Sequence, residues 1–331
     1  KWKFFMSPKA RVLLIAPEFY DYHKVIIKSI EGKSAKVDFY PEDITTIFFR
    51  VMRKLSSAYV QYAKDRYLNK ILNSIKINAY DIVFVIRGGI LTIDSLEMLR
   101  VKLPNAKFVM YQWDSNRQSH YKEKIDFFDV VKTFDLYDAN QYDIEYQSLF
   151  YTQPYKDIST IKKNIKYDLV FYGAYHSDRL EVVKKVDKFC TANNLVFKHH
   201  LYITKLSLLK NFLTRYIKFS DLKFLKTYKS GNPEILNSYS KARCVLDIEL
   251  NIQSGITMRT FEALGSGVKV VTTNSYIAKD PIYSPDNICI IDRKNPAIDL
   301  DFLKVEFKGN PIYEKYYIDN WLDNIMGIYA K

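Results

Sequence analysis

Short runs of apolar residues, each followed by a segment with helical periodicity, recur along the whole chain. Clear examples are RVLLIA at 11–16, DIVFVI at 81–86 and DLVFYG at 168–173. A strand that is buried on both faces has such a sequence, and both faces are covered when parallel strands are connected by helices. The alternation therefore predicts an α/β protein built on parallel sheets.

The length of the chain indicates how many domains it forms. Its 331 residues exceed what one ordinary core accommodates and predict two α/β domains. We place the first domain at residues 1–155 and the second at 167–310, with the lysine-rich, aperiodic segment 156–166 as the linker. Residues 311–331 form a C-terminal segment, within which 313–329 have the pattern of an amphipathic helix.

Composition excludes several classes of protein. The sequence is 48% apolar and 26% charged, which is typical of soluble globular proteins and excludes disordered and fibrous chains. The formal net charge of +13 suits nucleic acid, anionic lipid or a phosphorylated substrate. Because no zinc-finger, helix-turn-helix or single-strand-binding motif accompanies this charge, we expect no nucleic-acid partner.

Cysteine spacing and hydropathy indicate the compartment. Cys190, Cys244 and Cys289 lie too far apart for a metal motif or a disulfide framework, as is typical of proteins in a reducing compartment. The sequence has no run of about 18 apolar residues, and the opening KWKFF is shorter than the apolar core of a secretory signal. We therefore expect a cytoplasmic protein, which a peripheral contact could hold at the inner face of the membrane.

Candidate site residues of the first half follow the predicted strands. Ligands bind at the carboxyl edge of open α/β sheets, where the candidates Glu18, Tyr20 and His23 follow the first strand and Arg87 follows DIVFVI. Asp114 follows the strand at 107–112 beside Trp113, and partial burial there would raise its pKa toward that of a general base.

Each of these candidates also has a purely structural interpretation. His23 could begin the next helix on a solvated face, and Arg87 could close a surface turn beside two glycines. Asp114 could be the N-cap of the helix that follows, a role that favours the same residue type and does not exclude catalysis.

The segment SGITMRTFEALGSGVKVVTT, residues 254–273, predicts a helix between two loops, followed by a buried strand. Gly255, Thr257 and Arg259 lie at the start of this helix, where the helix dipole and backbone N–H groups favour a phosphate. Glu262, one turn later, can accept hydrogen bonds from sugar hydroxyls. The sequence therefore predicts a site that binds a nucleotide sugar.

A second cation lies at another predicted helix start. After the strand that ends at Gly173, Ser177 or Asp178 caps a helix whose first turn contains Arg179. A cation is unfavourable at a helix N-terminus, which indicates an anion nearby. The alternative is that Arg179 pairs with Asp178 or Glu181.

The most basic segment extends from Lys198 to Lys229 and contains eight Lys or Arg residues but one acid, Asp221. Apolar residues alternate with the basic ones at helical spacing, so the segment suits an anionic membrane surface or a lipid-linked substrate. The alternative is a helical insertion whose apolar face lies in the core and whose lysines lie in water.

Three motifs resemble the GT-B glycosyltransferases, and more narrowly the CgeB-type and capsule or lipopolysaccharide enzymes of bacteria. They are YQWDS at 111–115, FYGAYHSDRLE at 171–181 and GITMRTFEALGSG at 255–267. The resemblance implies two Rossmann-like domains facing across a cleft, with the nucleotide on the second domain and a C-terminal helix at 311–331 returning to the first.

The resemblance also implies residue roles. Glu262 would bind the ribose, and the diphosphate would lie against Gly255, Thr257 and Arg259 on one side and Gly173 and Arg179 on the other. Tyr172 and Ser254 join the donor-binding candidates, and Ser177 joins the candidate cleft residues. Ser254 stands where the large retaining families have an acid, and residues 17–20 replace the usual glycine-rich loop.

The implied activity is transfer of a sugar from a nucleotide diphosphate sugar to a glycan or lipid-linked glycan hydroxyl on a bacterial surface polymer. No metal or other cofactor is expected, and Asp114, or else His23, would be the base of an inverting reaction. Two alternatives remain: a nucleotide-sugar epimerase or hydrolase of the same fold, and a basic module that binds lipid or nucleic acid.

Overall fold

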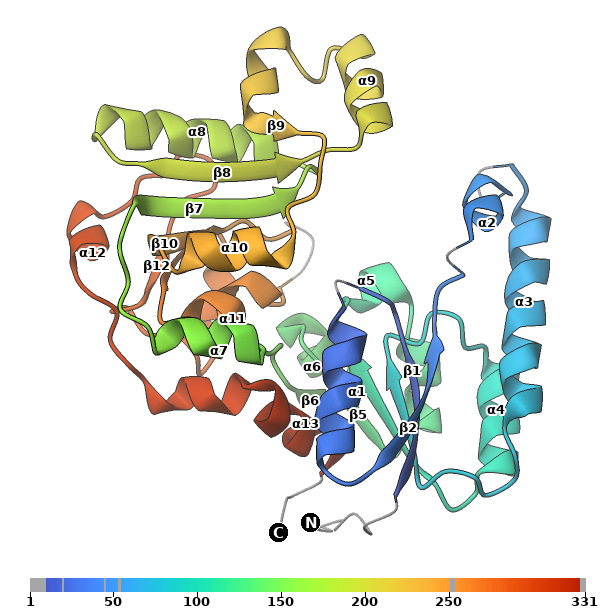
Figure 1. Cartoon of the computed structure of the whole chain (residues 1–331). Helices are drawn as coiled ribbons and strands as arrows, with labels where there is room; N and C mark the ends of the chain where they lie inside the picture. Colours follow the sequence, from blue (N-terminus) through green and yellow to red (C-terminus); the bar gives the residue numbers. More distant parts are fainter. Residues whose placement is uncertain (1–9, 20, 45, 53–54, 251–253, 328–331) are drawn as a thin grey trace. The chain divides into compact units, whose positions relative to one another are not determined.

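The computed structural model describes residues 10–19, 21–44, 46–52, 55–250 and 254–327 (Figure 1). The opening KWKFF and Tyr20 lie outside these ranges. The chain divides into two compact units. Unit 1 comprises Lys1–Ser148 and Ile318–Lys331, and unit 2 comprises Leu149–Tyr317.

Unit 1 contains a six-stranded sheet in which all neighbouring strands are parallel, in the order β2-β1-β3-β4-β5-β6. Its central strand β3 is buried along its whole length, as its unbroken apolar sequence predicts. The order 2-1-3-4-5 is one of the two common doubly wound patterns. The strands are β1 (Arg11–Ala16), β2 (Lys36–Pro41), β3 (Ile82–Ile86), β4 (Lys107–Gln112), β5 (Val130–Thr133) and β6 (Glu145–Tyr146).

Helices cover both faces of this sheet (Figure 1). On one face, α3 (Ser57–Ser74) and α4 (Ile93–Lys102) pack their leucines onto the inner strands. On the other face, α1 (Tyr22–Gly32) contacts α13 (Ile318–Met326), and α13 packs on β4 and β5. The shorter helices are α2 (Ile47–Met52), α5 (Asn116–Ser119), η1 (Lys122–Phe127) and α6 (Leu136–Tyr142).

Helix α13 supplies part of the core of unit 1, although it lies near the end of the chain. Trp321 is fully buried, and its ring lies edge-on to that of Tyr111 with centroids 4.8 Å apart. Its indole N–H donates a hydrogen bond of 2.9 Å to the carbonyl oxygen of Ser148. Lys107 and Lys132 donate to the carbonyl oxygens that end this helix, which complements its dipole.

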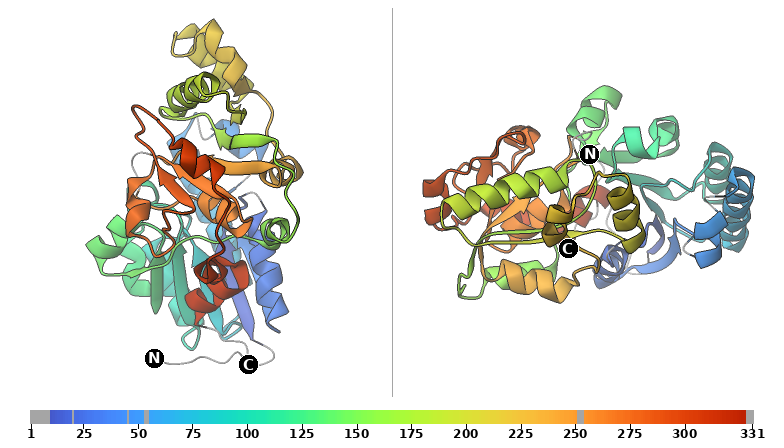
Figure 2. Two further views of the ribbon diagram at one scale, coloured as in Figure 1. Left: turned by 90° about the vertical axis from the view of Figure 1, so that its left-hand side faces the viewer. Right: turned by 90° about the horizontal axis from the view of Figure 1, so that it is seen from above.

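Unit 2 contains a second parallel sheet, in the order β12-β11-β10-β7-β8-β9 (Figure 2). Counted from its own first strand, this is the 3-2-1-4-5-6 order of the Rossmann fold read in reverse. Strand order therefore reverses between the neighbouring strands β7 and β10. The strands are β7 (Tyr167–Ala174), β8 (Phe197–Tyr202), β9 (Leu225–Lys226), β10 (Ala242–Asp247), β11 (Lys269–Thr272) and β12 (Ile288–Ile290).

The helices of unit 2 also form two layers. On one face, α8 (Arg179–Ala192) and α12 (Leu300–Lys304) pack onto residues such as Phe171 and Leu246. The second layer holds α7 (Gln153–Ser159), α10 (Asn232–Tyr239), α11 (Met258–Gly265) and η4 (Pro311–Tyr316), which contact one another. The remaining elements are α9 (Lys205–Leu213), η2 (Phe219–Phe224) and η3 (Ser275–Lys279).

The structure places the unit boundaries differently from the sequence-based prediction. The predicted linker at 156–166 is part of unit 2, where Tyr155 and Ile158 of α7 are buried and the ammonium of Lys163 donates to the carbonyl oxygen of Gly267. The predicted C-terminal helix is divided at Tyr317, so that η4 belongs to unit 2 and α13 to unit 1.

Gly265 allows helix α11 to lie against the buried ring of Tyr151, because a Cβ at position 265 would overlap three atoms of that ring. Replacing Gly265 with alanine should lower the free energy of unfolding by about 1–3 kcal/mol. Urea denaturation measures the change. Gly309→Ala is the matched control, since nothing lies within 4 Å of a Cβ there. Equal stability of the two variants would contradict this packing.

None of the helices in the described ranges is long and apolar enough to cross a membrane.

Candidate functional site

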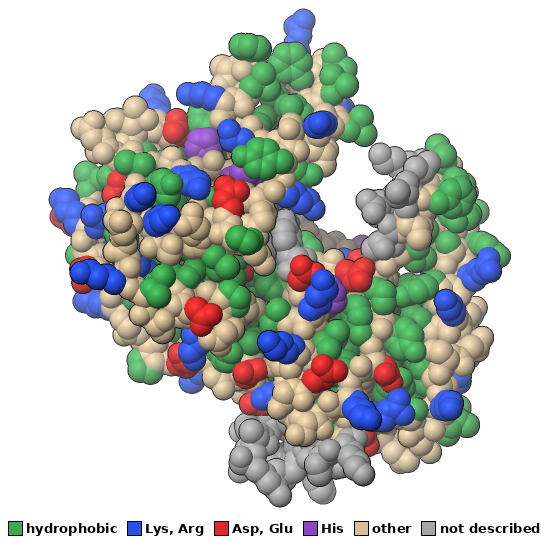
Figure 3. All heavy atoms as spheres, in the orientation of Figure 1, with side chains coloured by type: hydrophobic (Ala, Val, Ile, Leu, Met, Phe, Trp, Pro, Cys, Tyr) green, Lys and Arg blue, Asp and Glu red, His purple; other side chains and the backbone are tan. Residues whose placement is uncertain are grey.

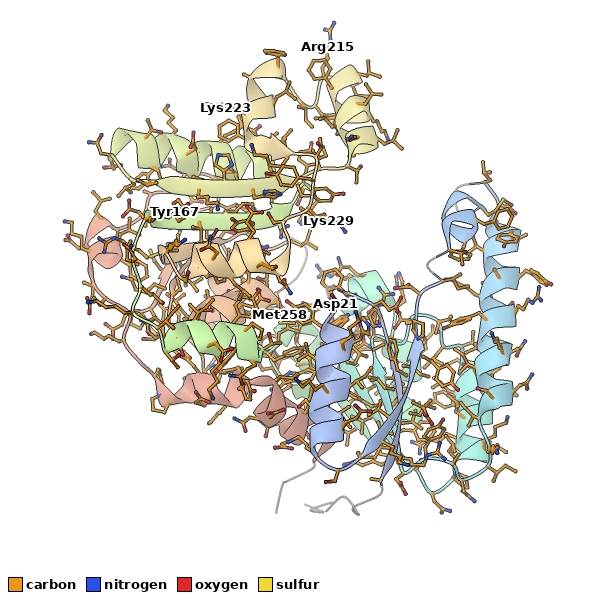
Figure 4. The ribbon with its side chains drawn as sticks, viewed as in Figure 1. Asp21, Tyr167, Arg215, Lys223, Lys229 and Met258 are labelled. Atoms are coloured by element: carbon orange, nitrogen blue, oxygen red, sulfur yellow. The ribbon has the colours of Figure 1, made fainter. Side chains whose placement is uncertain are left out.

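The candidate site of unit 2 lies at the point where its strand order reverses, which is where open α/β sheets bind ligands. Three arginines converge there from separate elements. Arg179 begins α8 directly after β7, Arg259 is in the first turn of α11 after β10, and Arg293 follows β12. Figure 4 labels Met258, the residue at which α11 begins.

Arg179 is a buried cation whose described hydrogen bonds go to backbone carbonyl groups. Its side chain donates to the carbonyl oxygens of Ile248, at 2.9 Å, and Ala174, at 3.2 Å. Among the described residues no carboxylate forms an ion pair with it. Burial, followed by repulsion from Arg259, lowers the pKa of Arg179 to about 9 even though Asp247 and other acids oppose the shift. A bound anion at this position would stabilise the charged form of Arg179 against burial and against repulsion from Arg259.

The alternative pairing of Arg179 with its neighbours in sequence is wrong. Asp178 binds Arg293 instead, and Glu181 binds Lys184 at 2.9 Å. Asp178 occupies the N-cap position of α8, one of the two positions predicted, but its side chain makes no capping hydrogen bond. Ser177 is exposed, has a left-handed backbone (φ 44°) and bonds to the imidazole of His176.

Arg259 and Thr257 are both held by Asp247, a fully buried carboxylate at the end of β10. Asp247 accepts hydrogen bonds from the hydroxyl of Thr257 at 2.8 Å, from the hydroxyl of Thr260 at 3.0 Å and from the guanidinium of Arg259. Although burial opposes it, the pKa of Arg259 is raised, chiefly by Asp247. The hydroxyl of Thr257 does not cap α11, which leaves this helix start without a capping side chain from its N-cap residue.

Arg293 connects three loops and is a site residue that the sequence did not reveal. It donates two hydrogen bonds of 2.7 Å to the carboxylate of Asp178 and also binds Glu249, whose carbonyl oxygen accepts at 2.9 Å. Burial raises the pKa of Glu249, and the hydroxyl of Thr273 donates to its carboxylate. A lone arginine just after a strand was the only signal, and it carries little information.

His176 is a second residue that the sequence did not single out within its motif. Burial, together with the positive charges of Arg179, Arg259 and Arg293, lowers its pKa to about 4. The imidazole is therefore neutral near pH 7. It contributes a hydrogen-bonding group to the loop after β7 without adding a fourth positive charge.

Tyr172 and Gly173 end strand β7 in different ways. The carbonyl oxygen of Tyr172 accepts a hydrogen bond of 2.9 Å from Arg259, but its buried hydroxyl bonds to Ser238 of α10, so the backbone alone takes part in the arginine cluster. A Cβ at Gly173 would lie 2.7 Å from the ring of Phe171 and 3.4 Å from the guanidinium of Arg179. Glycine therefore leaves room beside the arginine.

Glu262 lies buried in α11, close enough to Arg259 and Tyr239 for its charge to affect both of their pKa values. Ser254 and Gly255 are buried in the loop before this helix, and the amide of Asn274 donates to the carbonyl oxygen of Gly255 at 3.1 Å. The first turn of α11 and Glu262 are thus held in place by the same helix.

A second cluster lies at the carboxyl edge of the sheet in unit 1. Arg87, directly after β3, binds Glu42 and Asp43 and lies 3.9 Å from the carboxylate of Asp114. Glu42 is buried and also accepts a hydrogen bond of 2.8 Å from the backbone N–H of Gly88. Arg87 therefore joins acids that follow β2 and β4, rather than merely closing a surface turn.

Asp114 is half-buried, and burial, with a further contribution from Asp43, raises its pKa although Arg87 opposes the shift. Its alternative role as an N-cap is wrong. Helix α5 has Ser115 at the N-cap, and the N–H of Asn116 donates instead to the carboxylate of Asp138. Asp114 thus keeps its acceptor oxygens for other partners.

His23 and Glu18 occupy different environments. His23 is buried, not solvated, and its ring stacks on Phe39 at 5.1 Å. None of its described contacts reaches Asp114. Glu18 is exposed in the loop after β1, where its charge raises the pKa of Tyr67, a smaller effect than the burial of Tyr67 itself.

Within the described residues, no group of three or more His, Cys, Asp and Glu side chains has a geometry that could hold a metal ion.

Solved structures of low sequence identity share this fold. The "lipopolysaccharide outer core galactosyltransferase WaaB" is 13% identical, with a TM-score of 0.55, and the match covers 96% of this chain and 99% of that one. A glycosyltransferase from Rickettsia africae is 12% identical, with a TM-score of 0.50 and coverage of 96% and 94%. No protein-family model and no curated protein matches the sequence.

The UDP-GlcNAc 2-epimerase of Methanocaldococcus jannaschii, solved with UDP-GlcNAc and UDP, is also similar. It is 11% identical, with a TM-score of 0.51 and coverage of 96% of this chain and 99% of that one. At these identities the likeness is one of architecture. The chain consists of two Rossmann-like α/β domains of the GT-B type.

Proposed function

We propose that the chain is a glycosyltransferase that uses a nucleotide diphosphate sugar as donor. The observation that carries this proposal is Arg179, a buried guanidinium at the switch point of unit 2 that has carbonyl partners but no described ion pair. A diphosphate supplies the missing negative charge and accepts hydrogen bonds from a guanidinium in a bidentate manner. The GT-B architecture supports the same reading.

Two helix starts strengthen this proposal. Helices α8 and α11 both begin at the arginine cluster, and helix N-termini favour anions. Arg179 and the helix dipoles would stabilise the charge that develops on the leaving diphosphate, so the transfer is proposed to be independent of metal. Arg259 and Arg293, which already pair with acids, would orient the loops that surround it.

The proposed acceptor is a hydroxyl of a bacterial surface glycan, free or lipid-linked. The lipopolysaccharide core enzyme among the structural neighbours supports this choice. In an inverting transfer, Asp114 of unit 1 would accept the proton of that hydroxyl, because a carboxylate with a raised pKa is a stronger base. The buried, stacked His23 is less suited to this role.

Isothermal titration with a panel of nucleoside diphosphates tests the proposal. We expect one or two of them to bind, and failure of every nucleoside diphosphate to bind would contradict it. The similarity to an epimerase favours a second candidate, a nucleotide-sugar epimerase or hydrolase. Turnover of the donor without any acceptor would favour that candidate over transfer.

Replacing Glu262 with alanine should weaken nucleoside diphosphate binding by roughly tenfold or more, because a charge-assisted hydrogen bond to the ribose is lost. The Glu262→Gln variant, which keeps the shape and one acceptor oxygen, should bind with intermediate affinity. Titration calorimetry measures both variants, with Glu306→Ala as a control in an exposed loop of the same unit. Unchanged affinity in Glu262→Ala would remove this residue from the site.

A further inference from the structure

Unit 2 carries a surface feature that nucleotide binding does not explain: an insertion between β8 and β9, residues 204–224, which contains α9 and η2. No residue of α9 is buried. Several large apolar side chains of the insertion are instead exposed. They are Leu206 (67%), Leu209 (56%), Phe212 (41%), Leu213 (72%), Tyr216 (78%) and Phe219 (80%).

The alternative that the apolar face of this segment lies in the core therefore does not hold for most of α9. A different set of residues anchors the insertion to unit 2. Ile217 and Phe224 are buried in the core, and Leu208 packs against it. Thr204 caps α9 by accepting a hydrogen bond of 3.1 Å from the N–H of Ser207. The exposed apolar residues thus belong to a well-anchored segment, and they face away from the core.

On α9 the exposed leucines form one stripe, since Leu206, Leu209 and Leu213 are spaced at i, i+3 and i+7. In Figure 3 the apolar side chains of the insertion lie beside Lys and Arg side chains. Apolar residues in a contiguous exposed patch are rare on monomeric soluble proteins and mark interaction sites.

The outward charge of the insertion is positive throughout. Its basic residues are all exposed: Lys205, Lys210, Arg215, Lys218 and Lys223. Its one acid, Asp221, is buried, and its carboxylate binds Lys184 at 2.9 Å and the backbone N–H of Lys218 at 2.9 Å. The surface therefore presents cations and leucines but no carboxylate. Figure 4 labels Arg215 and Lys223, together with Lys229 just beyond the insertion.

We propose that the insertion docks on an anionic membrane surface. The leucines and aromatic side chains would enter the boundary between headgroups and acyl chains, and the basic residues would bind anionic headgroups. Aliphatic side chains favour this partner over nucleic acid, because leucine gains from acyl chains but neither stacks on bases nor binds phosphate. The proposal does not depend on the proposed enzymatic activity, since binding is measured directly.

Vesicle co-sedimentation of the full chain tests the proposal. We expect binding to vesicles of phosphatidylcholine mixed with phosphatidylglycerol and much weaker binding to pure phosphatidylcholine. Added salt should weaken the binding, because it screens the attraction between surface charges. Equal binding to both kinds of vesicle, or binding to neither, would overturn the proposal.

Two double variants separate the contribution of charge to vesicle binding from that of apolar burial. Arg215→Glu with Lys223→Glu should weaken binding at least about tenfold, because each basic residue near an anionic surface contributes roughly a fivefold factor. Leu209→Ser with Leu213→Ser should weaken it to a similar degree by removing apolar burial. The matched controls are Lys315→Glu and Val101→Ser, whose side chains are exposed elsewhere, and both should bind as the unmodified protein does.

Other binding partners of this surface, such as a second copy of the chain or a nucleic acid, would give different results in these experiments. If Leu209→Ser with Leu213→Ser abolished a dimer seen by analytical ultracentrifugation while vesicle binding stayed unchanged, the face would bind a second copy and the proposal would be wrong. It would also be wrong if an oligonucleotide bound this face and vesicles did not. Thermal unfolding of each variant establishes whether the fold is retained, which matters for Lys223→Glu because the ammonium of Lys223 lies 4.8 Å from the ring centroid of the anchoring residue Phe224.

Discussion

Replacing Arg179 with alanine should lower kcat by about 100- to 1,000-fold, the usual effect of removing one preorganised donor that stabilises a developing negative charge. The reason lies in its environment. Arg179 is buried, its described partners are carbonyl groups, and its pKa is lowered first by burial and then by nearby cations. These conditions favour the state in which a diphosphate is bound. Steady-state kinetics with the donor identified by titration measures the effect, and nucleoside diphosphate affinity should fall in parallel.

Control variants separate catalysis from folding in this experiment. Arg179→Lys keeps a charge but loses the planar fork, so it should recover only part of the activity. Arg243→Ala removes a half-exposed arginine of the same unit, which pairs with Asp168 at 3.2 Å, and should leave kcat unchanged. An Arg179→Ala protein that folds normally and turns over at the original rate would refute the proposed diphosphate site.

Replacing Asp114 with asparagine should lower kcat by about 100- to 10,000-fold while donor binding is retained, if the carboxylate is the general base. The pH profile supplies a sharper test. A base acts only when deprotonated, so the activity is present above the pKa of Asp114 and lost as the pH falls through it. Because burial raises this pKa, the loss should begin at a higher pH than for an ordinary aspartate. The residual activity of Asp114→Asn should lack this acidic limb.

Asp43→Asn is the informative control for Asp114. Asp43 raises the pKa of Asp114 and also shares Arg87 with it. Removing its charge should therefore lower the pKa of Asp114 and extend activity to lower pH, with little effect on the maximal rate. An acidic limb that persists unchanged in Asp114→Asn would assign the proton transfer to another group.

The strands were predictable because burial on both faces leaves a continuous apolar run. The predicted strands at 11–16 and 107–112 have the bounds of β1 and β4. The linker was not predictable, because α7 is anchored by Tyr155 and Ile158, two apolar residues within a polar segment. At Tyr151 the chain pairs with Tyr317 in an isolated parallel bridge. Pairing across such sequence distances leaves no local pattern.

The same limit explains which site residues the sequence revealed. Arg179, Arg259 and Asp114 follow strands or begin helices, and these positions can be inferred locally. Arg293 lies 115 residues from its partner Asp178, so that only the fold shows that they meet. Strand order alone decides which loops become neighbours at the switch point, and that order is set by long-range packing rather than by local motifs.

The late position of α13 has a consequence for how the protein is made. The core of unit 1 requires Trp321, whereas unit 2 is complete at Tyr317. During synthesis, the sheet of unit 1 therefore lacks α13 until residues 149–317, which form unit 2, have been translated. N-terminal domains usually fold first during synthesis, whereas here all residues of unit 2 are available before those of α13. Until then, the surface of β4 and β5 that α13 covers in the folded unit lacks that helix.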